Sequence, residues 1–270
     1  MSVPRDSLAD MRLATWNVNS IRARVDRVLA FLERSGTDVL AIQETKARDD
    51  QFPEDAFRAA GYEVAHHGLS QWNGVAIASR LPIEDVEIGF EGMPTWGEPA
   101  AAEARALGAT VGGVRVWSLY VPNGRTLEDP HYQYKLHWLS ALRTAAQGWT
   151  AADPDAQIAL VGDWNIAPRD EDVWDMAALA GATHVSPAER EALAALGEAG
   201  FEEVTRAHTP GAFTYWDYQR LRFPRNEGMR IDLVLASRAL AARVRAAHID
   251  RNERKGKGAS DHVPVVVDLA

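Results

Sequence analysis

Six short apolar runs in this sequence are joined to polar side chains that could bind a metal ion or a phosphate group. Carboxylate and amide oxygens are ligands that Mg²⁺ prefers, and amides, tyrosine and histidine can hydrogen-bond phosphate oxygens. Functional groups gather where strands end, because the sheet fixes the backbone while the loop leaves the side chain accessible. These side chains are Asn17, Asn19, Glu44, Tyr120, Asn123, Asp163, Asn165, Asp232, Asp261 and His262.

Each of these residues, taken alone, has a simpler structural explanation. Asn17 or Asn165 could satisfy the backbone of a turn, Glu44 could cap a helix, and Asp261 with His262 could form a hydrogen-bonded pair in a loop. Separate turns do not explain why carboxylates, amides and a histidine follow so many apolar runs. The set therefore predicts one site that binds a metal ion or phosphate.

Strands and helices must position these groups. Apolar spacing over residues 21–35 predicts a helix, Asp129 followed by proline predicts the start of a second helix that runs to Gln147, and residues 186–189 form a capping box for a third. The glycine pair 112–113 predicts a hairpin after residues 104–111 and therefore antiparallel pairing. The other expected strands are residues 12–16, 39–43, 74–79, 114–120, 158–162, 231–236 and 263–269.

The composition indicates one globular domain. The 270 residues are 46% hydrophobic and carry 29 Lys and Arg against 38 Asp and Glu, a net charge of −9 that excludes a wholly basic nucleic-acid coat. Cysteine is absent, no apolar run is long enough to span a membrane, and no nucleotide-binding glycine motif is present. We expect a cytoplasmic monomer, with residues 1–10 as an N-terminal extension and residues 11–270 as a single domain.

Basic residues concentrate in one part of the chain. Residues 215–257 carry 11 basic and five acidic side chains, so this segment has a charge of +6 and the remainder has −15. A solvated face is the simpler explanation of such a run. The alternative is a surface that follows phosphates, because release of counterions makes each Lys or Arg contact with DNA favourable.

In unbroken order from about Met11 to the C-terminus, the motifs resemble the exodeoxyribonuclease III family of AP endonucleases. This family belongs to the endonuclease/exonuclease/phosphatase superfamily, which includes deoxyribonuclease I. The resemblance implies an α/β fold: a four-layer sandwich of two packed mixed β-sheets flanked by helices, with the site at one rim. The matching segments are residues 15–20 (TWNVNS), 43–46 (QETK), 73–76 (NGVA), 120–124 (YVPNG), 162–168 (GDWNIAP), 230–232 (RID) and 260–264 (SDHVP).

The resemblance also implies a metal site. Glu44 corresponds to the family's metal ligand, and Asp261 and Asn19 are expected near the same ion. Asn19 stands where some relatives carry aspartate. A site of few carboxylates suits Mg²⁺, which keeps several waters, with Mn²⁺ as a substitute.

The resemblance assigns roles to the remaining polar residues. Asp163 and Asn165 resemble the pair that orients and deprotonates the attacking water. His262 is expected to bind phosphate, and Asp232 resembles the carboxylate that holds its ring in place. The donors expected for the phosphate or the leaving oxygen are Tyr120, Asn17 and Asn123.

A final set of residues is expected to select the substrate. The aromatic residues at the start of the basic segment, residues 215–257, can wedge against bases or line a pocket, and the neighbouring arginines can hold phosphates on either side. The family resemblance implies that Tyr215, Met229 and Ile231 line a small apolar pocket for a sugar without its base. Tyr215 stands where bacterial relatives often carry tryptophan, although an isolated Tyr-Trp pair is more often core packing. The residues of this predicted DNA contact are Tyr215, Trp216, Met229, Ile231, Arg222 and Arg225.

The resemblance implies metal-dependent hydrolysis of double-stranded DNA in base-excision repair. The expected activities are cutting 5′ to abasic sites, 3′-to-5′ exonuclease action and cleaning of 3′ ends, with no membrane partner. Two alternatives stay open. One is a nonspecific endonuclease, or an inositol-phosphate or phospholipid phosphatase, with the same core. The other is a catalytically silent DNA-binding member, which would lack one of Glu44, Asp163, Asp232 or His262, and all four are present.

Overall fold

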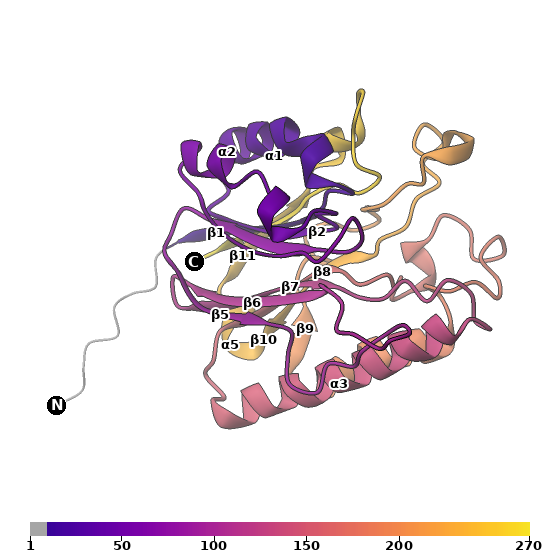
Figure 1. The fold of residues 1–270 in the computed structure, drawn as a ribbon. Helices are drawn as coiled ribbons and strands as arrows, with labels where there is room; N and C mark the ends of the chain where they lie inside the picture. The colour runs from indigo at the N-terminus through magenta and orange to yellow at the C-terminus, as the bar shows by residue number, and fades with distance from the viewer. Residues whose placement is uncertain (1–9) are drawn as a thin grey trace.

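The computed structural model describes residues 10–270, which form two six-stranded sheets (Figure 1). The extension predicted for residues 1–10 lies outside the described residues except for Asp10. The first sheet has the order β11 (Val244–Ile249), β12 (Val265–Leu269), β1 (Met11–Asn17), β2 (Val39–Gln43), β4 (Val75–Ser79) and β3 (Glu63–His67). The second has the order β5 (Ile83–Ile88), β6 (Ala106–Val111), β7 (Val114–Tyr120), β8 (Ile158–Asp163), β10 (Asp232–Ser237) and β9 (Phe201–Glu203).

Helices cover the outer faces of the two sheets. In Figure 1, α1 (Ile21–Ser35) and α2 (Glu54–Ala59) lie over the first sheet, and α3 (Pro130–Ala152) lies under the second. The helix α4 (Pro187–Glu198) packs against α3, and the short α5 (Arg238–Ala241) follows β10. Both sheets mix parallel and antiparallel pairs. The predicted four-layer α/β sandwich is confirmed.

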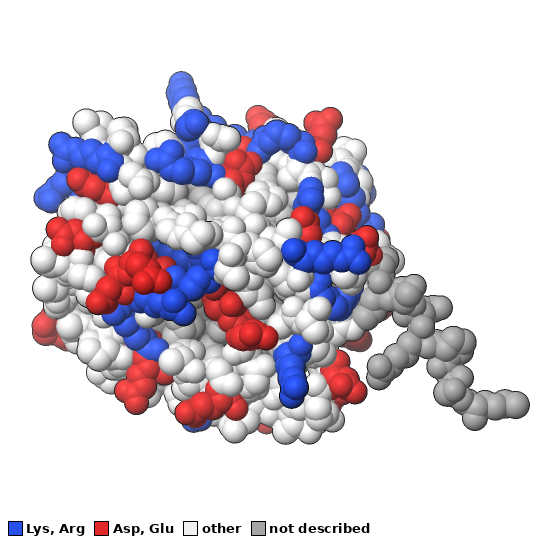
Figure 2. All heavy atoms as spheres, turned by 180° about the vertical axis from the view of Figure 1, so that it is seen from behind, with Lys and Arg blue, Asp and Glu red and all other residues white. Residues whose placement is uncertain are grey.

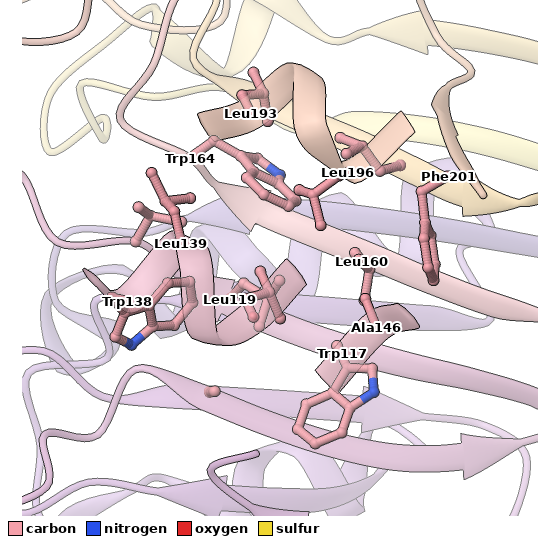
Figure 3. Packing of buried hydrophobic residues seen from close by; sticks show 14 of the residues in the cluster. Trp117, Leu119, Trp138, Leu139, Ala146, Leu160, Trp164, Leu193, Leu196 and Phe201 are labelled. Carbon is pink, nitrogen blue, oxygen red and sulfur yellow. The ribbon is translucent and has the colours of Figure 1, made fainter. Parts of the chain in front are cut away.

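Three apolar clusters hold the layers together. One lies between the sheets and contains Leu13 and Val161, and a second joins the first sheet to α1 through Trp16 and Phe31. The third joins the second sheet to α3 and α4, and Figure 3 shows its tryptophans and leucines. Burying side chains of this size is the main favourable contribution to folding.

The local signals in the sequence set most element ends. Helix α1 ends at Gly36, whose φ of 64° suits glycine, and α3 begins where the Asp129 carboxylate accepts a hydrogen bond from the His131 amide. Helix α3 continues to Ala152, five residues beyond the predicted end. The predicted capping box opens α4, and Gly112 and Gly113, both with positive φ, connect β6 to β7.

The strands that the sequence patterns did not predict, β3, β5, β9 and β11, are the four edges of the sheets. β5 is mostly exposed and carries three acidic residues, and β11 is half exposed and carries Arg245; charged side chains protect an edge from pairing with another chain. β9 has only three residues. Edge strands therefore lack the apolar run that identified the interior strands.

One face of the molecule carries both basic and acidic side chains. Figure 2 shows that basic and acidic side chains are intermixed on the face seen from behind, so this face has no continuous basic surface. Among residues 10–270, no helix combines the length and the apolar character needed to cross a membrane.

Candidate active site

Strand pairing brings several predicted residues to one rim of the sandwich. In the parallel pair β1–β2, Asn17 lies opposite Gln43, so Glu44 leaves the first sheet beside Asn17. In the second sheet, Asp163 lies between Tyr120 of β7 and Asp232 of β10. The register of the two sheets therefore fixes where these backbones begin their loops.

Glu44, Asp163 and His262 form a compact cluster at this rim. One polar atom from each lies within 4.8 Å of the others. Asn17, which is buried, connects the two sheets, because its Nδ2 donates to Glu44 Oε1 (2.9 Å) and to Asp163 Oδ2 (2.9 Å). The two carboxylates thus belong to one site although they come from different sheets.

Asp232 orients the imidazole of His262. His262 Nδ1 donates to Asp232 Oδ2 (2.8 Å), and Nε2 lies 3.7 Å from Asp163 Oδ2. Burial disfavours the imidazolium, but the carboxylates of Asp232 and Asp163 outweigh burial and raise the pKa of His262 to about 10. The ring is therefore cationic at neutral pH and presents Nε2 to the site.

Asp163 is the carboxylate most suited to accept a proton. Burial raises its pKa to about 7, Asp232 and Glu44 act in the same direction, and His262 opposes them. Asp163 Oδ1 accepts a hydrogen bond from the Asn165 backbone N–H (2.9 Å). A carboxylate with a pKa near neutrality is appropriate for a general base.

The amide of Asn165 is also held in place. Its Nδ2 donates to the carbonyl of Val121 (3.0 Å), and its Oδ1 accepts from Asn123 Nδ2 (3.2 Å). The loops that follow β7 and β8 are therefore joined through two predicted site residues.

Lys46 is a site residue that the sequence analysis missed, although it lies two residues after Glu44. Its Nζ lies 2.7 Å from Glu44 Oε2 and donates to Asn19 Oδ1 (2.6 Å). Burial raises the pKa of Glu44, but Lys46 and the Asn17 hydrogen bond outweigh burial and hold that pKa below its ordinary value. Asp261 is one contact further away, since its Oδ1 accepts from Asn19 Nδ2 (3.1 Å). Glu44 therefore lies directly beside Asp163 and His262. Asp261 is connected to Glu44 only indirectly, through the hydrogen bonds of Asn19 and Lys46.

Tyr120 faces the centre with its hydroxyl protonated. Burial and the Glu44 carboxylate raise the pKa of Tyr120 well above its ordinary value. The guanidinium of Arg105 lies 4.9 Å from the centre of the Tyr120 ring, and its Nη1 donates to the Tyr120 carbonyl (3.3 Å). Tyr120 is therefore a hydrogen-bond donor, and Arg105 is a neighbour that no local pattern indicated.

A cavity of about 520 Å³ opens next to this centre. Tyr120 and Asn123 form part of its wall, and Arg125 lies on its exposed side. Trp72 also lines it and is 66% exposed, which is unusual for so large an aromatic side chain. Trp72 could not be identified from the sequence, because a single tryptophan in a loop has no distinguishing pattern.

The segment from residue 14 to residue 262, which contains the whole centre, matches the model of the Endonuclease/Exonuclease/phosphatase family. The chain belongs to this family.

Relatives narrow the assignment within the family. An exodeoxyribonuclease of Bacillus subtilis is 31% identical over 263 residues, covering 94% of this chain and 98% of the relative. The 3′ phosphatase NExo from Neisseria, solved with a product DNA hairpin, is 33% identical with a TM-score of 0.90 and covers 96% of this chain and 99% of its own. An AP endonuclease from Archaeoglobus fulgidus is 35% identical with a TM-score of 0.89 and the same coverage. These findings confirm the predicted exodeoxyribonuclease III family, and the chain is a DNA-repair nuclease.

The structure brings together three of the residues predicted to line an abasic pocket. The ring of Tyr215 lies 4.8 Å from that of His262, and Tyr215 and Met229 exchange backbone hydrogen bonds of 2.9 Å. Both pack against a buried apolar cluster that contains Ile231, which is only 1% exposed. Tyr215 and Met229 are therefore the members of this family's predicted pocket that can reach a substrate.

The prediction that Trp216 contacts DNA is wrong. Its side chain is 1% exposed and packs edge-on against Phe223, with ring centres 5.2 Å apart. Its backbone holds neighbouring segments together, because its N–H donates to the Asp261 carbonyl (2.9 Å) and its carbonyl accepts from Arg254 Nη2 (3.1 Å). Tyr215 forms isolated bridges to Met229 and His262, and its ring contacts that of His262, whereas the next side chain, Trp216, is buried in the core.

Some arginines of the basic segment, residues 215–257, are buried in the fold and others are exposed. Arg230 is 1% exposed and donates to Thr205 Oγ1 (2.6 Å), so it does not belong to a surface that follows phosphates. Arg222 is paired with Glu227 (2.8 Å). The side chain of Arg225 is 61% exposed, which leaves it accessible to a ligand. Of the two arginines predicted to hold phosphates, Arg225 is the more accessible.

His184 is a second site neighbour that the sequence analysis missed. Asn123 Nδ2 lies 3.4 Å from His184 Nε2, and burial together with the Lys135 ammonium lowers the pKa of His184 to about 3. This imidazole is therefore neutral and can accept a hydrogen bond from Asn123. His184 lies 61 residues after Asn123 in the chain, and only the fold brings the two together. No local motif therefore indicates His184 as a site residue.

Proposed function

We propose that this nuclease hydrolyses phosphodiester bonds in double-stranded DNA with Mg²⁺, cuts 5′ to abasic sites, and removes nucleotides and blocking groups from 3′ ends. We further propose that residues 11–270 act as a single domain and as a monomer. The observation that carries the proposal is the cluster of Glu44, Asp163 and His262, in which two carboxylates, one with a pKa near neutrality, lie beside a cationic imidazole.

The oxygens of the site fit a hard divalent cation. Glu44 Oε2 and Asn19 Oδ1 both contact the ammonium of Lys46, so the two oxygens already face a common position for positive charge. Glu44 would hold the ion, with Asn19 and Asp261 nearby, and Mn²⁺ could replace Mg²⁺. When bound, the ion neutralises charge on the phosphoryl oxygens and the leaving oxygen.

The remaining groups supply the chemistry of hydrolysis. Asp163 takes a proton from the attacking water, which Asn165 orients through its fixed amide. The water oxygen bonds to phosphorus as the bond to the leaving oxygen breaks. The cationic ring of His262 stabilises the negative charge that develops on the phosphoryl oxygens. Tyr120 donates a hydrogen bond to the phosphate or the leaving oxygen. Asn17 and Asn123 donate as well once the phosphate replaces one of the two acceptors that each amide now contacts.

Substrate choice rests on the apolar group beside His262. Tyr215 and Met229 pack against the cluster that contains buried Ile231, and a sugar without a base has the small apolar surface that such a group can accept. Arg225 is placed to contact a neighbouring phosphate. Both the AP endonuclease and the 3′ phosphatase among the solved relatives support a substrate of damaged DNA.

Incision of a duplex with one tetrahydrofuran abasic-site analogue tests this function, against the same duplex with a normal base. Both strand ends are labelled, and each duplex is incubated with Mg²⁺ or with EDTA. We expect one Mg²⁺-dependent cut 5′ to the analogue, and release of phosphate from a parallel duplex that ends in a 3′-phosphate. Equal degradation of both duplexes would make the enzyme a general nuclease, and a complete absence of cleavage would overturn the proposal.

A further inference from the structure

A buried ion pair lies beneath the site and takes no part in the mechanism described above. Lys135 of α3 and Glu189 of α4 contact each other through Nζ and Oε1, and the side chains of both are 0% exposed. Burying a charge is costly unless it is paired and fully hydrogen-bonded. A pair in this position therefore requires an explanation beyond the stability of the fold.

Lys135 holds the backbone of two site residues. Its Nζ donates to the carbonyl of Asn165 (2.7 Å) and to the carbonyl of Asn123 (3.2 Å). These two carbonyls belong to the loops that follow β8 and β7. Together with the Glu189 carboxylate they use all three protons of the ammonium group.

Glu189 anchors a third segment to the same point. Its Oε1 accepts from Thr183 Oγ1 (2.6 Å) and from the His184 N–H (2.9 Å), and its Oε2 accepts from Ser186 Oγ (2.6 Å). His184 in turn faces the Asn123 amide. The capping box of α4 is thereby connected to the site through one carboxylate.

The hydrogen bonds around the pair are those of an ammonium and a carboxylate, because the three partners of Lys135 Nζ are all acceptors and Glu189 Oε1 accepts from Thr183 and His184. Burial lowers the pKa of Lys135, while Glu189 opposes this effect. Burial raises the pKa of Glu189, but the Lys135 ammonium and the surrounding donors outweigh burial and lower it. A charged ammonium is the form that can donate to three acceptors at once.

We propose that Lys135 and Glu189 are positioning residues, which fix the backbones of Asn123 and Asn165 so that their side-chain amides face the phosphate and the attacking water. This inference rests on the proposed function, because it assumes those roles for the two asparagines. A displacement of about 1 Å at a reacting group is sufficient to lower a rate by roughly 100-fold.

The test compares Lys135→Met, Glu189→Gln and the double variant with the wild type, using the abasic and 3′-phosphate duplexes. We expect kcat to fall by about 100-fold in Lys135→Met with a much smaller change in KM, since the catalytic groups remain but are misplaced. The double variant leaves no unpaired buried charge, so its melting temperature should recover above those of the single variants. Its kcat should stay low, because methionine donates no hydrogen bond to either carbonyl.

Leu196→Ala is the matched control for loss of stability. Leu196 lies on the same helix as Glu189 but points into the apolar cluster between α4 and the second sheet (Figure 3). We expect a lower melting temperature and an unchanged kcat below that temperature. Wild-type activity on neither duplex would refute the proposed function itself.

With an active wild type, two results would overturn the positioning role. One is a kcat of Lys135→Met close to the wild-type value. The other is recovery of kcat together with melting temperature in the double variant, which would show that the pair acts only on stability.

Discussion

The charge on His262 can be removed without changing its ring. Asp232→Asn keeps an oxygen acceptor of the same size near Nδ1 but removes the negative charge that contributes most to raising the pKa of His262. A pKa of about 10 against the ordinary 6.5 corresponds to roughly 5 kcal/mol in favour of the imidazolium. Without the Asp232 charge, less electrostatic stabilisation opposes the effect of burial, and we expect the pKa of His262 to fall well below 10.

The pH dependence follows from the sign of these shifts. In the wild type, kcat/KM should rise as Asp163 ionises near pH 7 and fall only as His262 loses its proton near pH 10. In Asp232→Asn the falling limb should move to lower pH. At pH 8 the loss of the positive charge should lower kcat/KM by about 100- to 1,000-fold, the effect of removing one electrostatic stabiliser.

Two assays check this prediction. NMR of labelled histidine in the metal-free protein follows the titration of His262 directly, and cleavage of the abasic duplex between pH 6 and pH 10 gives the rate profile. Asp268→Asn is the control, because Asp268 pairs with Arg12 rather than with His262. A His262 that still titrates near pH 10 in Asp232→Asn, or a rate profile that does not move, would refute the reasoning.

Three further predictions concern single side chains. Glu44→Gln keeps an acceptor for Asn17 but removes the ligand charge, so cleavage at saturating Mg²⁺ should be lost while the circular dichroism spectrum is unchanged; normal activity would contradict the metal assignment. Tyr120→Phe should lower kcat by about 100-fold in single-turnover cleavage, because a hydrogen-bond donor to the phosphate is removed, and an unchanged kcat would exclude that role. Trp216→Ala should lower the free energy of unfolding in urea by about 3–5 kcal/mol, as expected for a buried tryptophan, and a loss below 1 kcal/mol would contradict its place in the core.

The interior of the fold could be predicted from the sequence because buried strands are continuous apolar runs. The predicted strands at residues 39–43 and 114–120 match β2 and β7 in full. Where β12 was expected from residue 263, it begins at Val265, since the two preceding residues still belong to the loop that carries His262. The edge strands carry no such run, and only long-range pairing defines them.

The site was predictable only where its residues follow strands. Asn17, Glu44, Tyr120 and Asp163 occupy strand ends, and the sheets bring them together. The supporting groups lie at chain separations that no local pattern can bridge. Lys135 and Glu189 are 54 residues apart, and nothing in either helix sequence distinguishes this contact from an ordinary surface charge. Trp216 was assigned wrongly because it follows Tyr215, which is at the site. The two adjacent side chains point in different directions, Tyr215 toward His262 and Trp216 into the core.

Cleavage of the abasic duplex by Asp163→Asn tests the central claim most directly. Asparagine retains the shape of Asp163 and can still accept from the Asn165 N–H, but it cannot take a proton from water. The wild type should cut once, 5′ to the analogue, and only with Mg²⁺. The variant should bind the same duplex with unchanged affinity in fluorescence anisotropy and fail to cut it. Cleavage by the variant at the wild-type rate, or cleavage by the wild type in EDTA, would contradict a metal-dependent hydrolysis with Asp163 as its base.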